Sequence, residues 1–175
     1  GVYVSAAAGE PWDTLVGQTV SRGLWGREKL SGIPGSVGAA PIQNIGAYGA
    51  EISDVVEWVE AFDINTKSLR TLTNAECRFA YRDSIFKHPE GKNLIITRVA
   101  LRLRKKGSPN LGYKDLANYF TGTLSSPPRL PIGGQAFQGG DKRGGSIPTL
   151  PDIRKAVLEI RSKKFPDLNE FGTAG

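Results

Sequence analysis

The chain has almost no residues from which a metal or disulfide site could be built. Its 175 residues include one cysteine, Cys77, one histidine, His88, and no methionine. A single cysteine cannot form an intrachain disulfide, and a single histidine provides neither a structural zinc cluster nor a histidine-based catalytic triad within the chain. We therefore expect no metal site and a reducing, cytoplasmic location.

Long apolar runs are also missing, so we expect no membrane partner. The hydrophobic fraction of 39% and charged fraction of 23% suit a globular domain with a buried core. Lys and Arg together number 23 against 17 Asp and Glu, which gives a net charge of +6. That charge permits an anionic partner, such as a nucleic acid or a phosphorylated small molecule, without choosing among them.

Hydrophobic periodicity predicts a mixed α+β chain with an antiparallel sheet. Strands are expected at 2–5, 55–64, 68–72, 77–81 and 94–104, and helices at 11–22, at 113–120 and from Asp152, which should cap the last helix. The strand at 94–104 is the clearest, because Ile95, Thr97, Val99, Leu101 and Leu103 alternate with a largely basic face.

Glycines are concentrated in an uncharged segment at 30–50. Gly32, Gly35 and Gly38 are spaced three apart, so that backbone N–H groups could approach one anion without a Cβ in the way. A diphosphate would suit such a loop, with Ser36, Gln43 and Asn44 adding side-chain hydrogen bonds. The spacing fits neither the Rossmann fingerprint nor a P-loop, and a glycine-rich packed turn explains it equally well.

Three segments together carry a resemblance to a known family: the glycine loop at 32–49, the phrase Cys-Arg-Phe-Ala-Tyr-Arg-Asp-Ser-Ile-Phe-Lys at 77–87, and the strand at 95–103. They resemble the UDP-N-acetylenolpyruvoylglucosamine reductases. The resemblance implies an α+β FAD-binding domain of the vanillyl-alcohol-oxidase (PCMH) type with an antiparallel sheet and flanking helices. It also implies FAD-binding residues at Ile33, Pro34, Gly35, Ser36, Val37, Gly38, Ala39, Ile42, Gln43, Asn44, Ile45, Gly46 and Tyr48.

The same resemblance implies the reaction. NADPH reduces FAD, and the flavin then reduces UDP-N-acetylglucosamine enolpyruvate to UDP-N-acetylmuramate, a precursor of peptidoglycan. Arg82 matches the arginine that stabilises the developing negative charge, and Tyr81, Tyr113 and Lys164 match substrate-binding positions. From the residues alone, a surface salt bridge between Arg82 and Asp83 is the favoured interpretation, and only the resemblance reverses it. Tyr113 could likewise be a packed aromatic, and Lys164 a cation at a helix end.

The resemblance also divides the chain. Residues 1–121 correspond to the FAD-binding domain without its N-terminal part, 122–151 to a Gly- and Pro-rich insertion or loop, and 152–175 to a helix and linker. The linker would lead to a substrate-binding domain, and the chain stops one residue before the proton-donating serine of the family. We therefore expect these residues alone not to reduce the substrate.

Two other functions stay open. The exposed arginines of the strand at 94–104 suit a basic nucleic-acid-binding module, although no aromatic residue lies among them on that strand, so we expect no nucleic-acid partner. Another FAD-linked oxidoreductase of the same superfamily would share the fold, although the Tyr-Arg-Asp-Ser phrase at 81–84 disfavours it. In the favoured interpretation we expect a monomer.

Overall fold

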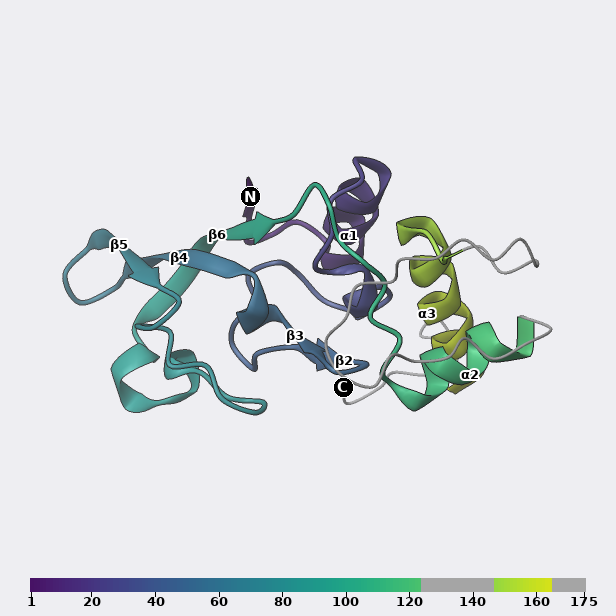
Figure 1. Cartoon of the computed structure of the whole chain (residues 1–175). Coiled ribbons are helices and arrows are strands. Elements are labelled where there is room, and N and C mark those ends of the chain that lie inside the picture. The colour runs from purple at the N-terminus through teal and green to yellow at the C-terminus, as the bar shows by residue number, and fades with distance from the viewer. Residues whose placement is uncertain (124–146, 165–175) are drawn as a thin grey trace.

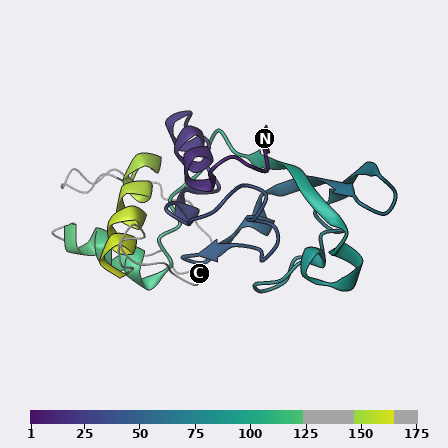
Figure 2. The ribbon, with the colours of Figure 1, turned by 180° about the vertical axis from the view of Figure 1, so that it is seen from behind.

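The computed structural model describes residues 1–123 and 147–164, and places a sheet at one end, helix α1 in the middle and helices α2 and α3 at the other end (Figures 1 and 2). The helices are α1 (Trp12–Ser21), α2 (Lys114–Thr123) and α3 (Leu150–Lys164). The strands are β1 (Val2–Ala7), β2 (Gly46–Ala47), β3 (Ala50–Glu51), β4 (Val56–Asp63), β5 (Ser68–Thr73) and β6 (Leu94–Leu103). Short 3-10 helices occur at Glu28–Leu30, Ile52–Asp54, Ile85–Lys87 and Pro89–Gly91.

The main sheet has the order β1-β6-β4-β5, and all of its neighbouring strands are antiparallel. One face of α1 packs against the inner side of this sheet through Trp12, Leu15, Val16 and Val20, all of them buried. These residues recur at the spacing of one helical face, which is why periodicity alone predicted this helix. The α+β class with an antiparallel sheet and flanking helices is thus confirmed.

The inner face of β6 differs from the predicted alternation. Val99, Leu101 and Leu103 are buried as expected, but Ile95 is 54% exposed. Pairing with β4 shifts register between Glu60–Arg98 and Ala61–Ile96, which leaves an extra residue in β6. Because one extra residue reverses which side chains point inward, Ile95 lies on the outer face.

The segment at 77–81 is a set of turns, so the prediction of a strand there is wrong. Arg78 and Arg82 both adopt left-handed backbone conformations, with φ of +48° and +54°, which an extended strand does not contain. The Cys77 N–H donates to the Thr73 carbonyl at 3.1 Å, and the Ile85 N–H donates to the Cys77 carbonyl at 2.8 Å. The Cys77 thiol is buried, and burial together with the Glu76 charge raises its pKa to about 12.

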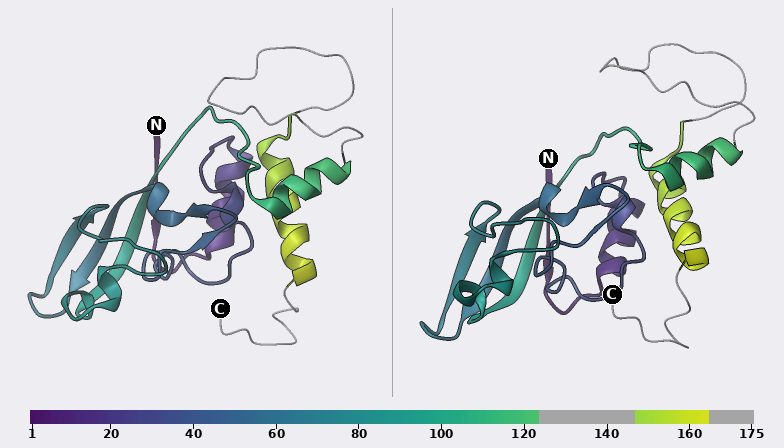
Figure 3. Two further views of the ribbon diagram at one scale, coloured as in Figure 1. Left: turned by 60° about the horizontal axis from the view of Figure 1, so that its bottom comes forward. Right: turned by 90° about the horizontal axis from the view of Figure 1, so that it is seen from below.

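Helices α2 and α3 enclose a second, smaller core, and α2 lies across α3 (Figure 3). Its buried members are Tyr48, Leu116, Phe120, Ile153, Ala156 and Val157. Helix α3 begins two residues before the predicted cap: the Asp152 carboxylate accepts hydrogen bonds from the N–H and hydroxyl of Thr149, at 2.8 and 2.6 Å. Asp152 therefore lies inside the first turn, and Thr149 precedes the helix.

The expected insertion at 122–151 overlaps both helices, since α2 ends at Thr123 and α3 begins at Leu150. Its residues 124–146, and the expected linker at 165–175, lie outside the described residues. Among the described helices none is both long enough and apolar enough to cross a membrane.

Candidate functional site

The glycine-rich loop is a series of tight turns held against β1 and the start of α1. The Val37 N–H donates to the Glu10 carbonyl at 2.8 Å, the Gly38 N–H donates to the Ala8 carbonyl at 2.9 Å, and the Gly35 carbonyl accepts from the Trp12 N–H at 2.9 Å. A Cβ at Gly38 would lie 2.6 Å from the Cβ of Ala8. Gly38 therefore permits close packing, and its N–H is already used within the protein.

The predicted cofactor residues divide into a buried and an accessible set. Val37, Gly38, Asn44, Ile45 and Tyr48 are buried. The accessible set is Ile33, Pro34, Gly35, Ser36, Ala39, Ile42, Gln43 and Gly46. A ligand can therefore reach the loop chiefly through the second set, which contains no charged side chain.

Asn44 was predicted to hydrogen bond a ligand through its side chain, but the structure uses that side chain internally. Its amide nitrogen donates to the Glu51 carboxylate at 2.7 Å and to the Ala80 carbonyl at 2.9 Å, and its amide oxygen accepts from the Ser53 N–H at 3.1 Å. The residue is 1% exposed and has a φ of +43°. Asn44 therefore fastens the end of the loop to the turn that carries Arg82.

Arg82 lies against the end of the glycine loop. Its Nη2 donates to the carbonyl of Gly46 at 2.6 Å, and its guanidinium carbon lies 5.7 Å from the ring centroid of Tyr81. Asp83, the alternative partner, instead accepts from His88 at 2.8 Å. No carboxylate in residues 1–123 or 147–164 forms an ion pair with Arg82, so its charge remains free to meet an anion.

Tyr113 and Lys164, predicted separately, both lie beside the second core, through contacts with Tyr48 and Asp115 respectively. The rings of Tyr113 and Tyr48 make an edge contact, with centroids 5.3 Å apart, and the Lys164 ammonium donates to the Asp115 carboxylate at 2.5 Å. The pKa of Lys164 is raised by this hydrogen bond, and Tyr48 and Tyr113 act in the same direction. Burial raises the pKa of the Tyr48 hydroxyl, against the opposing charges of Arg161 and Lys164.

The hairpin β2–β3 joins these two places. Gly46, at its start, holds Arg82, and Tyr48, in its turn, contacts Tyr113. Tyr48 has a φ of +51°, and its carbonyl accepts from the buried ammonium of Lys29 at 3.1 Å, which fixes the turn. Tyr81 lies beside Arg82, and its side chain is 82% exposed. In the part of the chain that the structure describes, Tyr81 does not contact Tyr113 or Lys164.

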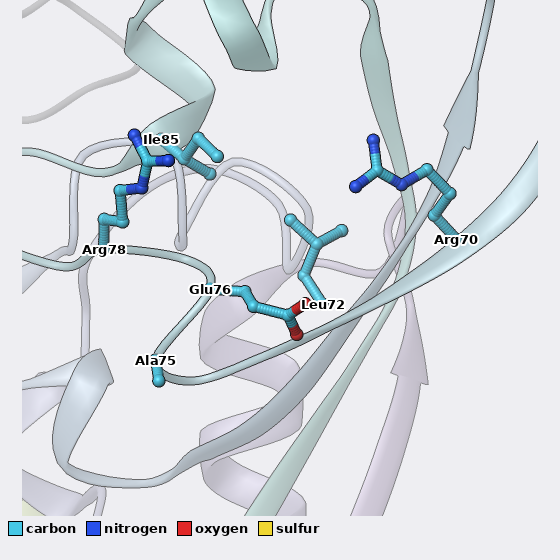
Figure 4. Close-up of a pocket in the computed structure, with 6 residues that line it drawn as sticks. All are labelled: Arg70, Leu72, Ala75, Glu76, Arg78 and Ile85. Carbon is cyan, nitrogen blue, oxygen red and sulfur yellow. The ribbon is translucent and has the colours of Figure 1, made fainter.

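A cavity of about 400 Å³ lies apart from these residues, between β5 and the turn at 75–78 (Figure 4). Arg70, Glu76 and Arg78 line it, with Leu72, Ala75 and Ile85. Each charge already has a protein partner: Arg70 pairs with Asp63 at 3.5 Å, Arg78 pairs with Glu90 at 3.3 Å, and Glu76 accepts from Thr73. This cavity contains none of the predicted site residues.

Comparisons with known proteins agree with the resemblance. The family model described as "FAD binding domain" matches residues 1–72. The UDP-N-acetylenolpyruvoylglucosamine reductase of Neisseria meningitidis serogroup A is 41% identical over 174 residues, and that of Paraburkholderia xenovorans is 43% identical over 173; each match covers 99% of this chain and 45% of the relative. Over nearly its whole length the chain is similar to the matching part of these reductases. It spans about 45% of the length of these relatives.

A solved structure supports the same fold. The reductase from Thermus caldophilus matches with a TM-score of 0.51 and 25% identity, over 93% of this chain and 69% of that one. The family model and this structure confirm the expected FAD-binding domain architecture. Sequence reasoning missed Asp13, Asp115, Arg154 and Arg161, whose contacts with the site join distant parts of the chain and leave no local motif.

Proposed function

We propose that the chain forms the FAD-binding part of a reductase that converts UDP-N-acetylglucosamine enolpyruvate to UDP-N-acetylmuramate at the expense of NADPH. The observation that carries the proposal is the hydrogen bond from Arg82 to Gly46, because it joins the predicted catalytic residue to the predicted cofactor loop. The FAD-binding family model over 1–72 and the relatives named for this reaction support it. The cytoplasmic location and the monomeric state stay predictions.

The loop fits the diphosphate of FAD in chemistry and in space. Its accessible residues carry no carboxylate that would repel an anion, and a Cβ at Gly35 would meet nothing within 4 Å, so the backbone there is open. Gly35 has a φ of +111°, a conformation suited to glycine. Pro34 has no N–H, and the N–H of Ala39 already donates to the Ser36 carbonyl at 3.1 Å. We infer that the N–H of Gly35 and the side chains of Ser36 and Gln43 would donate to the diphosphate, that Pro34 and Ala39 would lie against it, and that the bound flavin would supply the hydride.

Arg82 would stabilise charge on the substrate. Reduction of the enolpyruvyl group places negative charge next to its carboxylate, and a fixed guanidinium lowers the energy of that state. Gly46 fixes one nitrogen of Arg82, and the ring of Tyr81 lies beside it. Two features hold this geometry before substrate binds. The backbone of Arg82 is left-handed, and the side chain of Asn44 donates a hydrogen bond to the Ala80 carbonyl.

The diphosphate of the UDP-sugar would bind near Lys164 and Tyr113. Lys164 at the end of α3 provides the cation, and the hydroxyl of the half-exposed Tyr113 can donate to a phosphate oxygen. Asp115 now pairs with Lys164, and it holds the ammonium in place until a phosphate shares or replaces that contact. The expectation of no nucleic-acid partner stays a prediction.

The proposal is tested by replacing Arg82 in the complete product of the gene, called the full-length protein below, because these 175 residues alone are not expected to reduce the substrate. Arg82→Met should retain the flavin absorbance bands and lower kcat with the enolpyruvyl substrate by about a hundredfold, the usual effect of removing one transition-state donor. Arg78→Met is a matched control, because Arg78 is also an exposed arginine in a left-handed turn but pairs with Glu90. A wild type without bound flavin, or an Arg82→Met variant as active as the control, would contradict the proposed function.

A further inference from the structure

The backbone of Gly32, at the start of the glycine loop, is held by two helices. The Gly32 N–H donates to Oδ1 of Asp13 in α1 at 2.7 Å, and the Gly32 carbonyl accepts from Nε of Arg161 in α3 at 3.0 Å. Gly32 has a φ of +70°, and a Cβ there would lie 2.9 Å from Leu158 of α3. The position therefore needs glycine for its backbone conformation, and a larger residue would also have to displace the end of the Leu158 side chain.

The carboxylate that orients Gly32 is itself fixed by α3. Arg154 donates from Nη1 to Oδ1 of Asp13 at 2.7 Å and from Nη2 to Oδ2 at 2.8 Å, which is a bidentate pair. Burial raises the pKa of Asp13, but the hydrogen bonds from Arg154 and Gly32 outweigh it and leave that pKa below its ordinary value. Asp13 is therefore ionised at neutral pH, and its two oxygens connect α1, the loop and α3.

Helix α3 also carries the residue proposed to bind the UDP-sugar. Lys164 lies three residues beyond Arg161 and ten beyond Arg154, so about 15 Å of one helix separates the Asp13 contact from the Lys164 ammonium. The same helix packs its buried residues Ile153, Ala156 and Val157 in one cluster with Tyr48, whose ring contacts Tyr113. One rigid element thus touches both the cofactor loop and the proposed diphosphate site.

We infer that Asp13, Arg154 and Arg161 are positioning residues that couple the two sites, so that a UDP-nucleotide bound at the Lys164 end of α3 tightens FAD binding at the glycine loop. The inference rests on the proposed function. A ligand that fixes α3 lowers the entropic cost of ordering Gly32 and the turns that follow it. FAD that fixes the loop likewise lowers the entropic cost of ordering α3. The coupling must be reciprocal, because it is a difference in binding free energy.

The test measures FAD affinity in the full-length protein by flavin fluorescence, with and without saturating UDP-N-acetylglucosamine. In the wild type the nucleotide should tighten FAD binding about tenfold, within the usual range of such couplings. The measured ratio is the dissociation constant of FAD without the nucleotide divided by that with it. In Asp13→Asn and in Arg154→Gln this ratio should fall toward one. Arg154→Lys should have a ratio between that of Arg154→Gln and that of the wild type, because lysine keeps the charge. Arg161→Gln should lower the ratio as well.

Asp152→Asn is the matched control, since it weakens the first turn of α3 without contacting Gly32. It should lower the melting temperature and keep the wild-type ratio. If the coupling depended only on the stability of α3, Asp152→Asn would lower the ratio too. An unchanged ratio in Asp13→Asn and Arg154→Gln, or an equal loss in Asp152→Asn, would overturn the coupling while FAD binding itself stands. A wild type that binds no FAD would instead overturn the proposed function, and the coupling with it.

Discussion

At the scale of single residues, Arg27 is the side chain least compatible with its surroundings. It is 1% exposed, and within residues 1–123 and 147–164 its Nε, Nη1 and Nη2 have no hydrogen-bond partner. The neighbouring Glu28 carboxylate instead accepts the backbone N–H groups of Gly26 and Arg27, each at 2.9 Å. Burial lowers the pKa of Arg27 to about 9 against the opposing charge of Glu28, so the guanidinium is still charged at neutral pH.

Replacing Arg27 with an apolar side chain of similar length should therefore stabilise the fold. Arg27→Met removes the unpaired donors and leaves a flexible chain that can fill the same space, so we expect the free energy of unfolding to rise by about 2 kcal/mol. Urea denaturation at pH 7 measures the change. Arg102→Met, at an exposed position of β6, should change it by less than about 0.5 kcal/mol. A less stable Arg27→Met would show that the contact with Trp12, 5.8 Å from the guanidinium carbon, outweighs the missing hydrogen bonds.

At the scale of elements, the sequence predicted those that depend on local pattern. Helix α1 and strand β6 were predicted close to their observed bounds, because one apolar face repeats at the period of each element. Strands β4 and β5 were predicted close to theirs from strand-like runs on either side of the turn at Asn65 and Thr66. The turn at 77–81 was missed, since left-handed backbone at Arg78 has no sequence signal of the kind that glycine or asparagine gives. The internal role of Asn44 was missed because two of its partners, Glu51 and Ala80, are brought to it only by the fold.

The start of α3 gives a prediction about pH. Hydrogen bonds from the hydroxyl and N–H of Thr149 lower the pKa of Asp152. A carboxylate with a lowered pKa in the folded state stabilises the helix above its ordinary pKa, and this contribution is lost as the pH falls through the lowered value. Asp152→Ala should therefore speed amide exchange in α3 about fivefold at pH 7, a loss of about 1 kcal/mol.

The effect of Asp152→Ala should vanish once the pH falls below the lowered pKa of Asp152, because the wild-type carboxyl is then protonated and has lost its charge. Hydrogen exchange of the α3 amides at pH 7 and at an acid pH below that lowered pKa makes the comparison. Lys155→Ala, on the exposed side of the same helix, serves as the control and should change exchange little at either pH. An equal effect of Asp152→Ala at both pH values would show that size at this position matters rather than charge.

At the scale of the whole molecule, the described residues form two cores of unequal size. The larger lies between the sheet and α1, and the smaller lies between α2, α3 and Tyr48. The bidentate pair of Asp13 with Arg154 and the hydrogen bond from Arg161 to Gly32 join α3 to the larger core. The smaller core buries few side chains, so it should open at a lower free energy than the sheet.

Leu116→Ala tests whether the two cores open separately. Leu116 is fully buried in the smaller core, and its truncation should cost about 3 kcal/mol, which would speed amide exchange in α2 and α3 about a hundredfold. The amides of β4 and β6 should keep their exchange rates, because their hydrogen bonds lie in the larger core. Val99→Ala, in that larger core, should speed exchange in both regions, since α3 has no stable docking surface once the sheet and α1 open. Equal acceleration of β6 and α3 in Leu116→Ala would instead make the molecule one cooperative unit, in which the cofactor loop and the Lys164 end of α3 can only form together.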